Sequence, residues 1–101
     1  MPSEVDDTLK RLSNRKGVKG VVILNGDGQA IRSTLDPELT VKYGRLISSL
    51  VQQTRTTIST LDDQNDLTFL RVRTKKHEIM IAPDREYLLI VVQNPAETMQ
   101  A

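Results

Sequence analysis

Apolar residues recur at helical spacing in two stretches of the chain. The first stretch lies near the N-terminus, where Val5, Leu9 and Leu12 stand three or four residues apart. This spacing predicts a short helix with one narrow apolar stripe. Ser3 is suited to cap the start of this helix, and Gly17 is suited to follow its end.

The second helical stretch is longer and has a wider apolar face. Asp36 and Pro37 supply a cap residue and a first-turn proline, and both favour a helix start. The small residues Gly44 and Ser48 lie on the rim of the apolar face, which is broader than packing on a single sheet requires. With successive residues about 100° apart, that face fills an arc of about 140° and contains Leu39, Tyr43, Leu46, Ile47, Leu50, Val51, Ile58 and Leu61.

Five shorter stretches have the character of strands bounded by turn residues. The continuous apolar run at 21–24 predicts a strand buried on both faces. Asn-Gly-Asp-Gly at 25–28 predicts a hairpin turn into a returning strand at 29–34. After a polar loop, three further strands joined by tight turns are predicted at 67–73, 78–82 and 87–93.

The predicted elements follow the order αββαβββ in one α/β domain. We expect this domain to span residues 1–95 and residues 96–101 to form a disordered tail. The length of 101 residues, with 38% hydrophobic and 27% charged residues, fits one ordinary globular domain.

Charge and composition narrow the classes of partner. A formal net charge of +1 provides no strong attraction to nucleic acid or to an anionic membrane. The absence of cysteine excludes disulfides and thiolate metal sites. The charged first fifteen residues predict no signal peptide, and the longest apolar run, at 87–92, is too short to span a bilayer. We therefore expect a soluble intracellular protein without membrane insertion.

Three short motifs resemble catalytic or ligand-binding patterns, and each lacks a part that its chemistry requires. His77 has no serine or cysteine partner at a recognisable nucleophile elbow and is predicted to be a turn residue. Gly26 and Gly28 lack the third glycine of a dinucleotide-binding loop. The acids at 62–66 lack the glycine and glutamate of a calcium loop. We predict no enzyme activity, cofactor, metal or small-molecule substrate.

The predicted strand at 67–73 is the strongest functional candidate. Because 87–92 is typical of a central strand, we expect 67–73 at a sheet edge, where its unpaired backbone is a template for another strand. Two interpretations remain open: a symmetric dimer that also packs its long helices at Gly44, Ser48 and Val51, or a monomer that tolerates the edge. Side chains alternate between faces, so Thr68, Leu70 and Val72 are expected toward the long helix, and Leu67, Phe69, Arg71 and Arg73 on the opposite face.

Longer runs of this sequence resemble the roadblock-type dynein light chains. The resemblance covers residues 4–95 and is strongest at 64–73 (QNDLTFLRVR) and 75–80 (KKHEIM). Shorter matches occur at 9–11, 16–18, 31–36, 82–84 and 93–95.

The resemblance implies a roadblock/longin-like αββαβββ sandwich, in which an antiparallel five-stranded sheet carries helices on opposite faces. It further implies a homodimer through the third strand and second helix, with one continuous ten-stranded sheet. Such proteins are non-catalytic, bind the dynein intermediate chain, and support motor assembly and cargo attachment in microtubule-based transport. A paralogous light chain is a further candidate partner.

On this basis the expected location is the cytoplasm and the microtubule-associated dynein complex, or the axoneme of a cilium or flagellum. The alternative is a GTPase-regulating scaffold subunit of the same fold. We expect the intermediate chain to dock on Leu67, Phe69, Arg71 and Arg73. The expected dimer interface comprises Gly44, Ser48, Val51, Leu67, Thr68, Phe69, Leu70, Arg71, Val72 and Arg73.

Overall fold

The computed structural model describes residues 2–95. The elements in this part of the chain are α1 (Pro2–Ser13), β1 (Val18–Leu24), β2 (Ala30–Ser33), α2 (Pro37–Leu61), β3 (Leu70–Arg73), β4 (Glu78–Pro83) and β5 (Leu88–Gln93). The predicted αββαβββ order is therefore confirmed. The tail expected at 96–101 lies outside the described residues.

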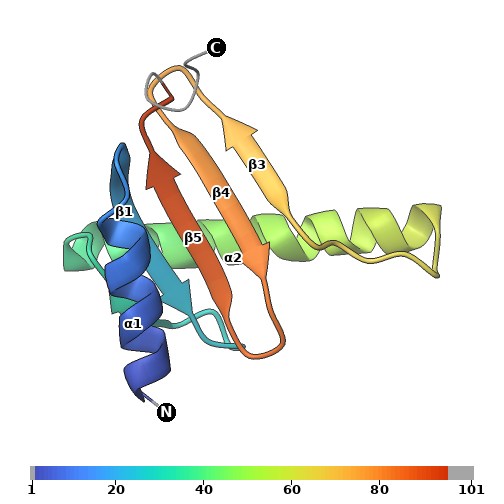
Figure 1. The fold of residues 1–101 in the computed structure, drawn as a ribbon. Coiled ribbons are helices and arrows are strands. Elements are labelled where there is room, and N and C mark those ends of the chain that lie inside the picture. The colour runs from blue at the N-terminus through green and yellow to red at the C-terminus, as the bar shows by residue number, and fades with distance from the viewer. Residues whose placement is uncertain (1, 96–101) are drawn as a thin grey trace.

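The five strands form one antiparallel sheet in the order β2-β1-β5-β4-β3. β5 lies at the centre and β3 at an edge, as the sequence predicts (Figure 1). Along β5, Ile90 lies opposite Val22 on one neighbour and opposite Ile81 on the other. All three side chains are fully buried, so the middle of the sheet is closed to solvent.

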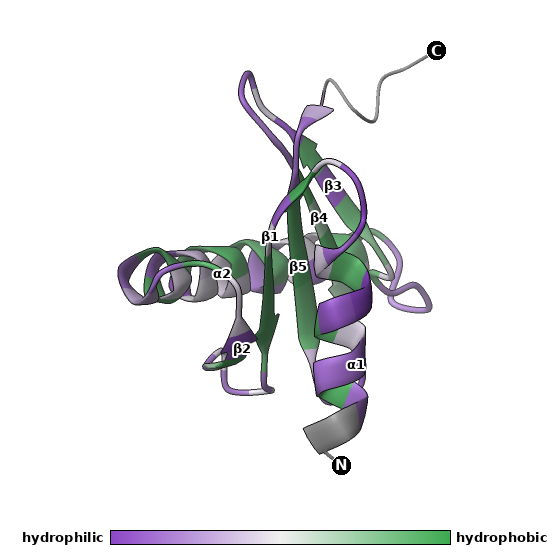
Figure 2. Ribbon diagram, turned by 60° about the vertical axis from the view of Figure 1, so that its left-hand side comes forward, coloured by the Kyte–Doolittle hydropathy of each residue, from purple (hydrophilic) through white to green (hydrophobic). Residues whose placement is uncertain are grey.

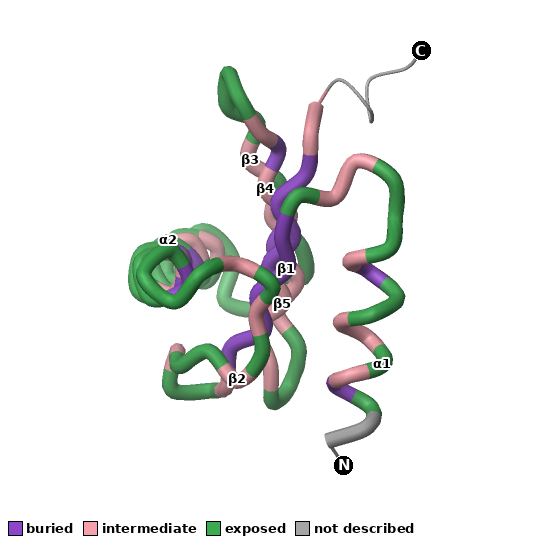
Figure 3. The backbone as a smooth tube through the Cα atoms, turned by 90° about the vertical axis from the view of Figure 1, so that its left-hand side faces the viewer, coloured by how far each residue is buried: buried purple, intermediate pink, exposed green. Residues whose placement is uncertain are grey.

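The two helices cover opposite faces of this sheet (Figure 3). Because side chains of a strand alternate between its faces, the apolar run of β1 contributes to a core on each side. Val22 and Leu24 pack with Ile47 and Val51 of α2. Val21 and Ile23 belong to the second core, which also contains Val5, Leu12 and Val91. The strand predicted to be buried on both faces is thus confirmed.

The bounds of α1 differ from those that its caps predicted. The helix begins at Pro2, before Ser3, and ends at Ser13. Gly17 therefore does not follow the last helical turn; it lies in the turn into β1 with φ 87°, a left-handed conformation that glycine adopts without a steric penalty. An ion pair of 2.7 Å between Asp6 and Arg32 joins α1 to β2.

The start of α2 is fixed by the predicted cap. The Asp36 carboxylate accepts a hydrogen bond of 2.8 Å from the backbone N–H of Leu39, and Pro37 occupies the first turn. Thr40 adds a second attachment, since its hydroxyl lies 2.6 Å from that of Ser33 on β2. The N-terminus of the long helix is therefore held against the β2 edge of the sheet.

Asp36→Ala is expected to lower the free energy of unfolding by about 1 kcal/mol, because the N–H of Leu39 loses its acceptor. For a domain of this size the melting temperature should fall by about 4–8 °C, which differential scanning calorimetry measures. Asp36→Asn keeps an oxygen acceptor and serves as the control. An equal loss in both variants would show that the hydrogen bond at the cap is not the source of the stability.

The turn between β1 and β2 has the predicted hairpin form. Asn25 donates its backbone N–H to the carbonyl of Gln29, and its side-chain oxygen accepts the N–H groups of Asp27 and Gln29. Gly28 has φ 85°. A side chain at this position would be strained by the backbone conformation and would also meet the Ser48 hydroxyl at 2.9 Å.

β3 is shorter than the sequence predicts, with regular pairing at Leu70–Arg73 only. Its ladder with β4 ends where Leu70 lies opposite Ile81. Continued in the same register, the ladder would place Thr68 opposite Pro83. Proline has no N–H to donate to a ladder, so residues 67–69 remain outside the sheet of this chain.

Candidate protein-interaction surface

The β3 edge of the sheet has no neighbouring strand within the described residues (Figure 1). α2 crosses the sheet, and its C-terminal part extends past this edge (Figure 1). An open strand edge presents backbone N–H and C=O groups that can pair with another strand. The edge strand and the overhanging helix therefore delimit one continuous surface, which begins where the sheet of this chain stops.

A stripe of leucines along α2 lies in solvent; we call Leu39, Leu46 and Leu50 the α2 stripe. They are 7 and 4 residues apart, so they share one side of the helix. Leu46 is the most exposed of the three, at 52%. Figure 2 shows α2 with both hydrophobic and hydrophilic segments, beside a largely hydrophobic sheet. The wide apolar face predicted for the helix is thus only partly covered by its own sheet.

Within one chain, the three α2 residues predicted for the helix contact with a second copy face their own sheet. Gly44 is buried, and a Cβ there would meet the Gly28 carbonyl and Leu24 at 3.3 Å. Val51 is part of the core on the α2 side. Ser48 faces Gly28, and its hydroxyl is buried without a hydrogen-bond partner.

These three residues therefore pack against their own sheet, although Ser48 remains half-exposed, and their contact with a second copy stays a prediction. The small residues on the rim of the apolar arc allow α2 to lie close to β1 and to the β1–β2 turn. On the other side of the arc, the residues of the α2 stripe remain exposed to a partner.

A basic face occupies the opposite side of β3, where the exposed residues are Phe69, Arg71 and Arg73. The Arg71 guanidinium lies 6.0 Å from the centre of the Phe69 ring, at the limit of a cation–π contact. Phe69 is 49% exposed. The expected mixture of apolar and cationic side chains on this face is confirmed for these three residues.

The expected position of Leu67 on that basic face is wrong, since Leu67 packs against the core on the α2 side. Residues 67–69 are not in a regular ladder, so strict alternation does not extend to them. Leu70 lies on the α2 side as predicted. Thr68 is exposed and Val72 is half-buried.

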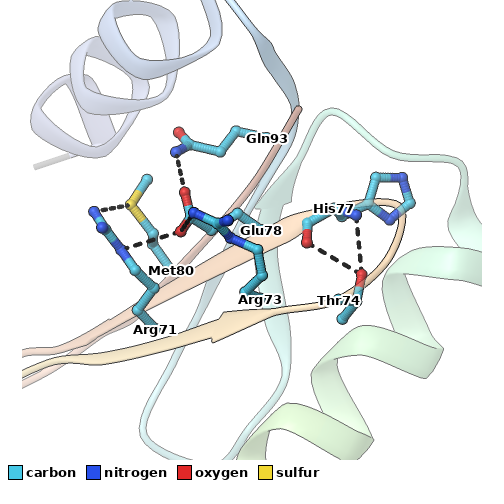
Figure 4. Close-up of polar contacts among 7 residues, drawn as sticks. All are labelled: Arg71, Arg73, Thr74, His77, Glu78, Met80 and Gln93. Atoms are coloured by element: carbon cyan, nitrogen blue, oxygen red, sulfur yellow. Dashed lines mark hydrogen bonds and ion pairs between the residues drawn. The ribbon is translucent and has the colours of Figure 1, made fainter. Parts of the chain in front are cut away.

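Glu78 is the polar residue that the sequence did not single out (Figure 4). It is only 1% exposed, and Gln93 donates a hydrogen bond of 3.0 Å to its carboxylate. The other carboxylate oxygen lies 3.6 Å from Nε of Arg71 and 3.5 Å from an Nη of Arg73. A buried carboxylate requires such partners, because removing a charge from water is costly unless it is paired.

The buried carboxylate of Glu78 therefore forms ion pairs with both arginines of β3. The register of the β3–β4 hairpin could have revealed this cluster, since it places Glu78 opposite Arg73 and Met80 opposite Arg71. His77 is confirmed as a turn residue: its backbone carbonyl accepts the N–H of Thr74 at 2.8 Å.

The described residues include no candidate metal centre. No set of three or more His, Cys, Asp or Glu residues at 2–95 could hold a metal ion. A groove of about 490 Å³ between α1 and the β4–β5 turn is lined by apolar residues such as Val5, Tyr87 and Leu89 and by polar ones such as Glu4 and Thr8. None of the described helices is long and apolar enough to cross a membrane.

The fold is an α/β sandwich with one antiparallel sheet and a helix on each face. A family model described as the Roadblock/LC7 domain matches residues 4–94. The chain therefore belongs to the Roadblock/LC7 family.

Solved structures of low sequence identity share this fold. A Roadblock/LC7 domain from Streptomyces avermitilis is 19% identical, with a TM-score of 0.76 over 87% of this chain and 73% of that one. The gliding protein MglB from Thermus thermophilus is 10% identical, with a TM-score of 0.78 over 93% and 73%. A structure described as MglB with a tetrameric arrangement is 11% identical, with a TM-score of 0.77 over 93% and 73%.

Proposed function

We propose that this Roadblock/LC7 domain is a non-catalytic docking module. It self-associates and binds a protein partner on the surface that the associated copies form together. The observations that carry the proposal are the open β3 edge and the exposed α2 stripe. Unpaired edges and contiguous apolar patches both favour association. Pairing through β3 would join two five-stranded sheets into one ten-stranded sheet, and the overhanging end of α2 would lie over the second sheet.

Self-association is supported by the similar MglB structure, which is described as tetrameric. A two-fold symmetric contact uses the same patch on both copies, and β3 with the α2 stripe provides a self-complementary one. Sedimentation velocity at micromolar concentration is expected to show a dimer. A monomer at these concentrations would contradict self-association and, with it, a binding surface formed by two copies.

Two classes of partner follow from different observations. The matched structures are bacterial Roadblock/LC7 and MglB proteins. They favour the broader role, a scaffold that binds a small GTPase and alters its nucleotide cycle. The sequence runs at 64–73 and 75–80 favour the narrower role, a light chain of a dynein motor that binds the intermediate chain in the cytoplasm or an axoneme. In the second case a dimer can hold two intermediate chains and favour their pairing by avidity.

Affinity purification of the full chain from cell extract, followed by binding tests with the purified candidates, separates these roles. Recovery of a small GTPase, with direct binding and a changed rate of nucleotide exchange or hydrolysis, would establish the scaffold. Recovery of dynein intermediate and heavy chains, with direct binding of the intermediate chain, would establish the light chain. Direct binding of neither purified protein would refute both roles.

Phe69→Ala is expected to weaken partner binding by about tenfold or more while the protein stays dimeric. The half-exposed ring is the largest apolar group on the basic face, and buried aromatic side chains dominate many interfaces. Isothermal titration calorimetry with the purified partner measures the loss. Val41→Ala is the control, because Val41 is an exposed apolar residue on the side of α2 away from the α2 stripe. Equal affinity of Phe69→Ala and the parent would show that the partner docks elsewhere.

A further inference from the structure

We propose that one end of the sheet binds an acidic peptide segment of a partner protein, on four cations that the fold brings together from two distant parts of the chain. These cations, which we call the cationic end, are Arg15 and Lys19 beside the start of β1, and Lys75 and Lys76 in the β3–β4 turn. All four residues are exposed. The proposal does not rest on self-association, because the whole cationic end belongs to one chain.

The strand register places both parts of the cationic end at the same end of the sheet. Val18 at the start of β1 lies opposite Gln93 on β5, and Gln93 lies opposite Glu78 at the start of β4. Glu78 in turn lies opposite Arg73, the last residue of β3. The loop before β1 and the turn after β3 are therefore at one end of the sheet (Figure 1). Three strand spacings of about 4.8 Å separate β1 from β3, so about 14 Å of sheet lies between the two pairs of cations.

The opposite end of the sheet is mainly acidic. The turns that follow β1 and β4 are located there, since Leu24 and Pro83 both lie opposite Leu88. The exposed acids of these turns and of the nearby start of α1 are Glu4, Asp27, Asp84 and Glu86, with Arg85 between the last two.

The distance between the two ends allows each to act separately on a partner. β1 has 7 residues, which corresponds to about 20 Å from one end of the sheet to the other. This is about twice the Debye length of about 10 Å at 0.1 M salt. The formal net charge of +1 therefore conceals two ends of opposite sign, and the attraction of an anionic partner depends on the local charge of the cationic end.

No acid among residues 2–95 forms an ion pair with the cationic end. Asp6 pairs with Arg32, and Glu78 pairs with the two arginines of β3. A group of cations that lacks acidic neighbours raises the local concentration of anionic ligands. The carboxylates that balance the cationic end are therefore expected from another molecule.

The surroundings of the cationic end favour a protein segment over a bilayer or a nucleic acid. The large exposed apolar residues of the described chain lie on α2 and at Phe69, and none lies at the cationic end. This end thus has no apolar group to enter a bilayer and no exposed Phe, Tyr or Trp ring to stack on a base. Next to the β3–β4 turn, the Glu78 carboxylate already pairs with two arginines of this chain.

The spacing of the cations defines the acidic segment further. An extended chain rises about 3.3 Å per residue, so about four residues cover the 14 Å between the two pairs of cations. A segment with two acidic pairs separated by about four residues would reach both. Fluorescence anisotropy with the full chain and the labelled, end-blocked peptide Glu-Glu-Ser-Ser-Glu-Glu tests this at low salt.

Reversing either pair of charges is expected to weaken binding of the peptide by at least about tenfold, because two attractive ion pairs become repulsive. The two variants are Arg15→Glu with Lys19→Glu, and Lys75→Glu with Lys76→Glu. The corresponding alanine variants remove charge without reversing it and should show smaller losses. Circular dichroism checks that each variant is folded. A loss in only one of the two variants would overturn a segment that spans both pairs.

Arg45→Glu with Arg55→Glu is the matched control, because it changes the net charge equally at two exposed positions of α2. It should bind the peptide within about twofold of the parent, since charges beyond a Debye length are screened. An equal loss in the control would assign binding to the overall charge and overturn the proposal.

The same assay separates the kinds of anionic partner. A single-stranded DNA oligonucleotide of equal charge and vesicles that contain phosphatidylserine are expected to bind more weakly than the peptide. Tighter binding of either would assign the cationic end to a nucleic acid or a membrane and refute the acidic protein segment. A monomeric protein that binds the peptide would support this proposal while it contradicts self-association.

Discussion

Replacing Leu46 and Leu50 together with glutamate is expected to convert the self-associated protein into a folded monomer. Both side chains are exposed on α2 and neither belongs to the two buried cores, so the fold of one chain does not depend on them. Burying a leucine contributes about 1.5–3 kcal/mol, and a carboxylate in its place must be desolvated without a partner. Loss of two such contacts corresponds to at least about a hundredfold weaker association.

Val41→Glu is the matched control, because Val41 is 68% exposed and points away from the α2 stripe. Size-exclusion chromatography with light scattering measures the mass of each variant, and circular dichroism checks the helix content. The prediction requires a monomer for the double variant and a dimer for the control. A dimer in both would assign the association to a surface that does not include the stripe.

Ile90→Ala is expected to lower the free energy of unfolding by about 2–5 kcal/mol, the usual range for truncation of a large buried aliphatic residue. Ile90 is fully buried on the central strand, between Val22 of β1 and Ile81 of β4. Domains of this kind have a total stability of about 5–15 kcal/mol, so the variant could lose a large part of it. Urea denaturation followed by circular dichroism measures the change.

Leu61→Ala provides the comparison, since Leu61 is 78% exposed and its truncation should change the stability by less than about 0.5 kcal/mol. All variants must be compared at one protein concentration, because association stabilises the folded state by mass action. A similar loss at both positions would mean that the end of α2 is covered in the associated protein, and not in solvent.

Local chemistry explains why the order of the elements could be predicted from the sequence. The Asp36 cap, the turn at 25–28 and the apolar run at 21–24 each act through neighbouring residues, so their structures follow from residue type alone. The central place of β5 followed from its continuous apolar composition. The bounds of β3 could not be predicted from the sequence. They depend on Pro83 of β4, which is distant in sequence from the residue that it would lie opposite.

The candidate interaction surface shows more clearly which features the sequence determined and which the tertiary structure decided. The sequence determined that the α2 arc is too wide for one sheet and that one strand near 67–73 lies at an edge. Only the tertiary structure decided which part of the arc remains exposed, because the close approach of Gly44 to the β1–β2 turn fixes the rotation of the helix. It also brought Glu78 beneath Arg71 and Arg73. Such contacts depend on the register between strands, and register is a property of the assembled sheet that no single segment of the chain encodes.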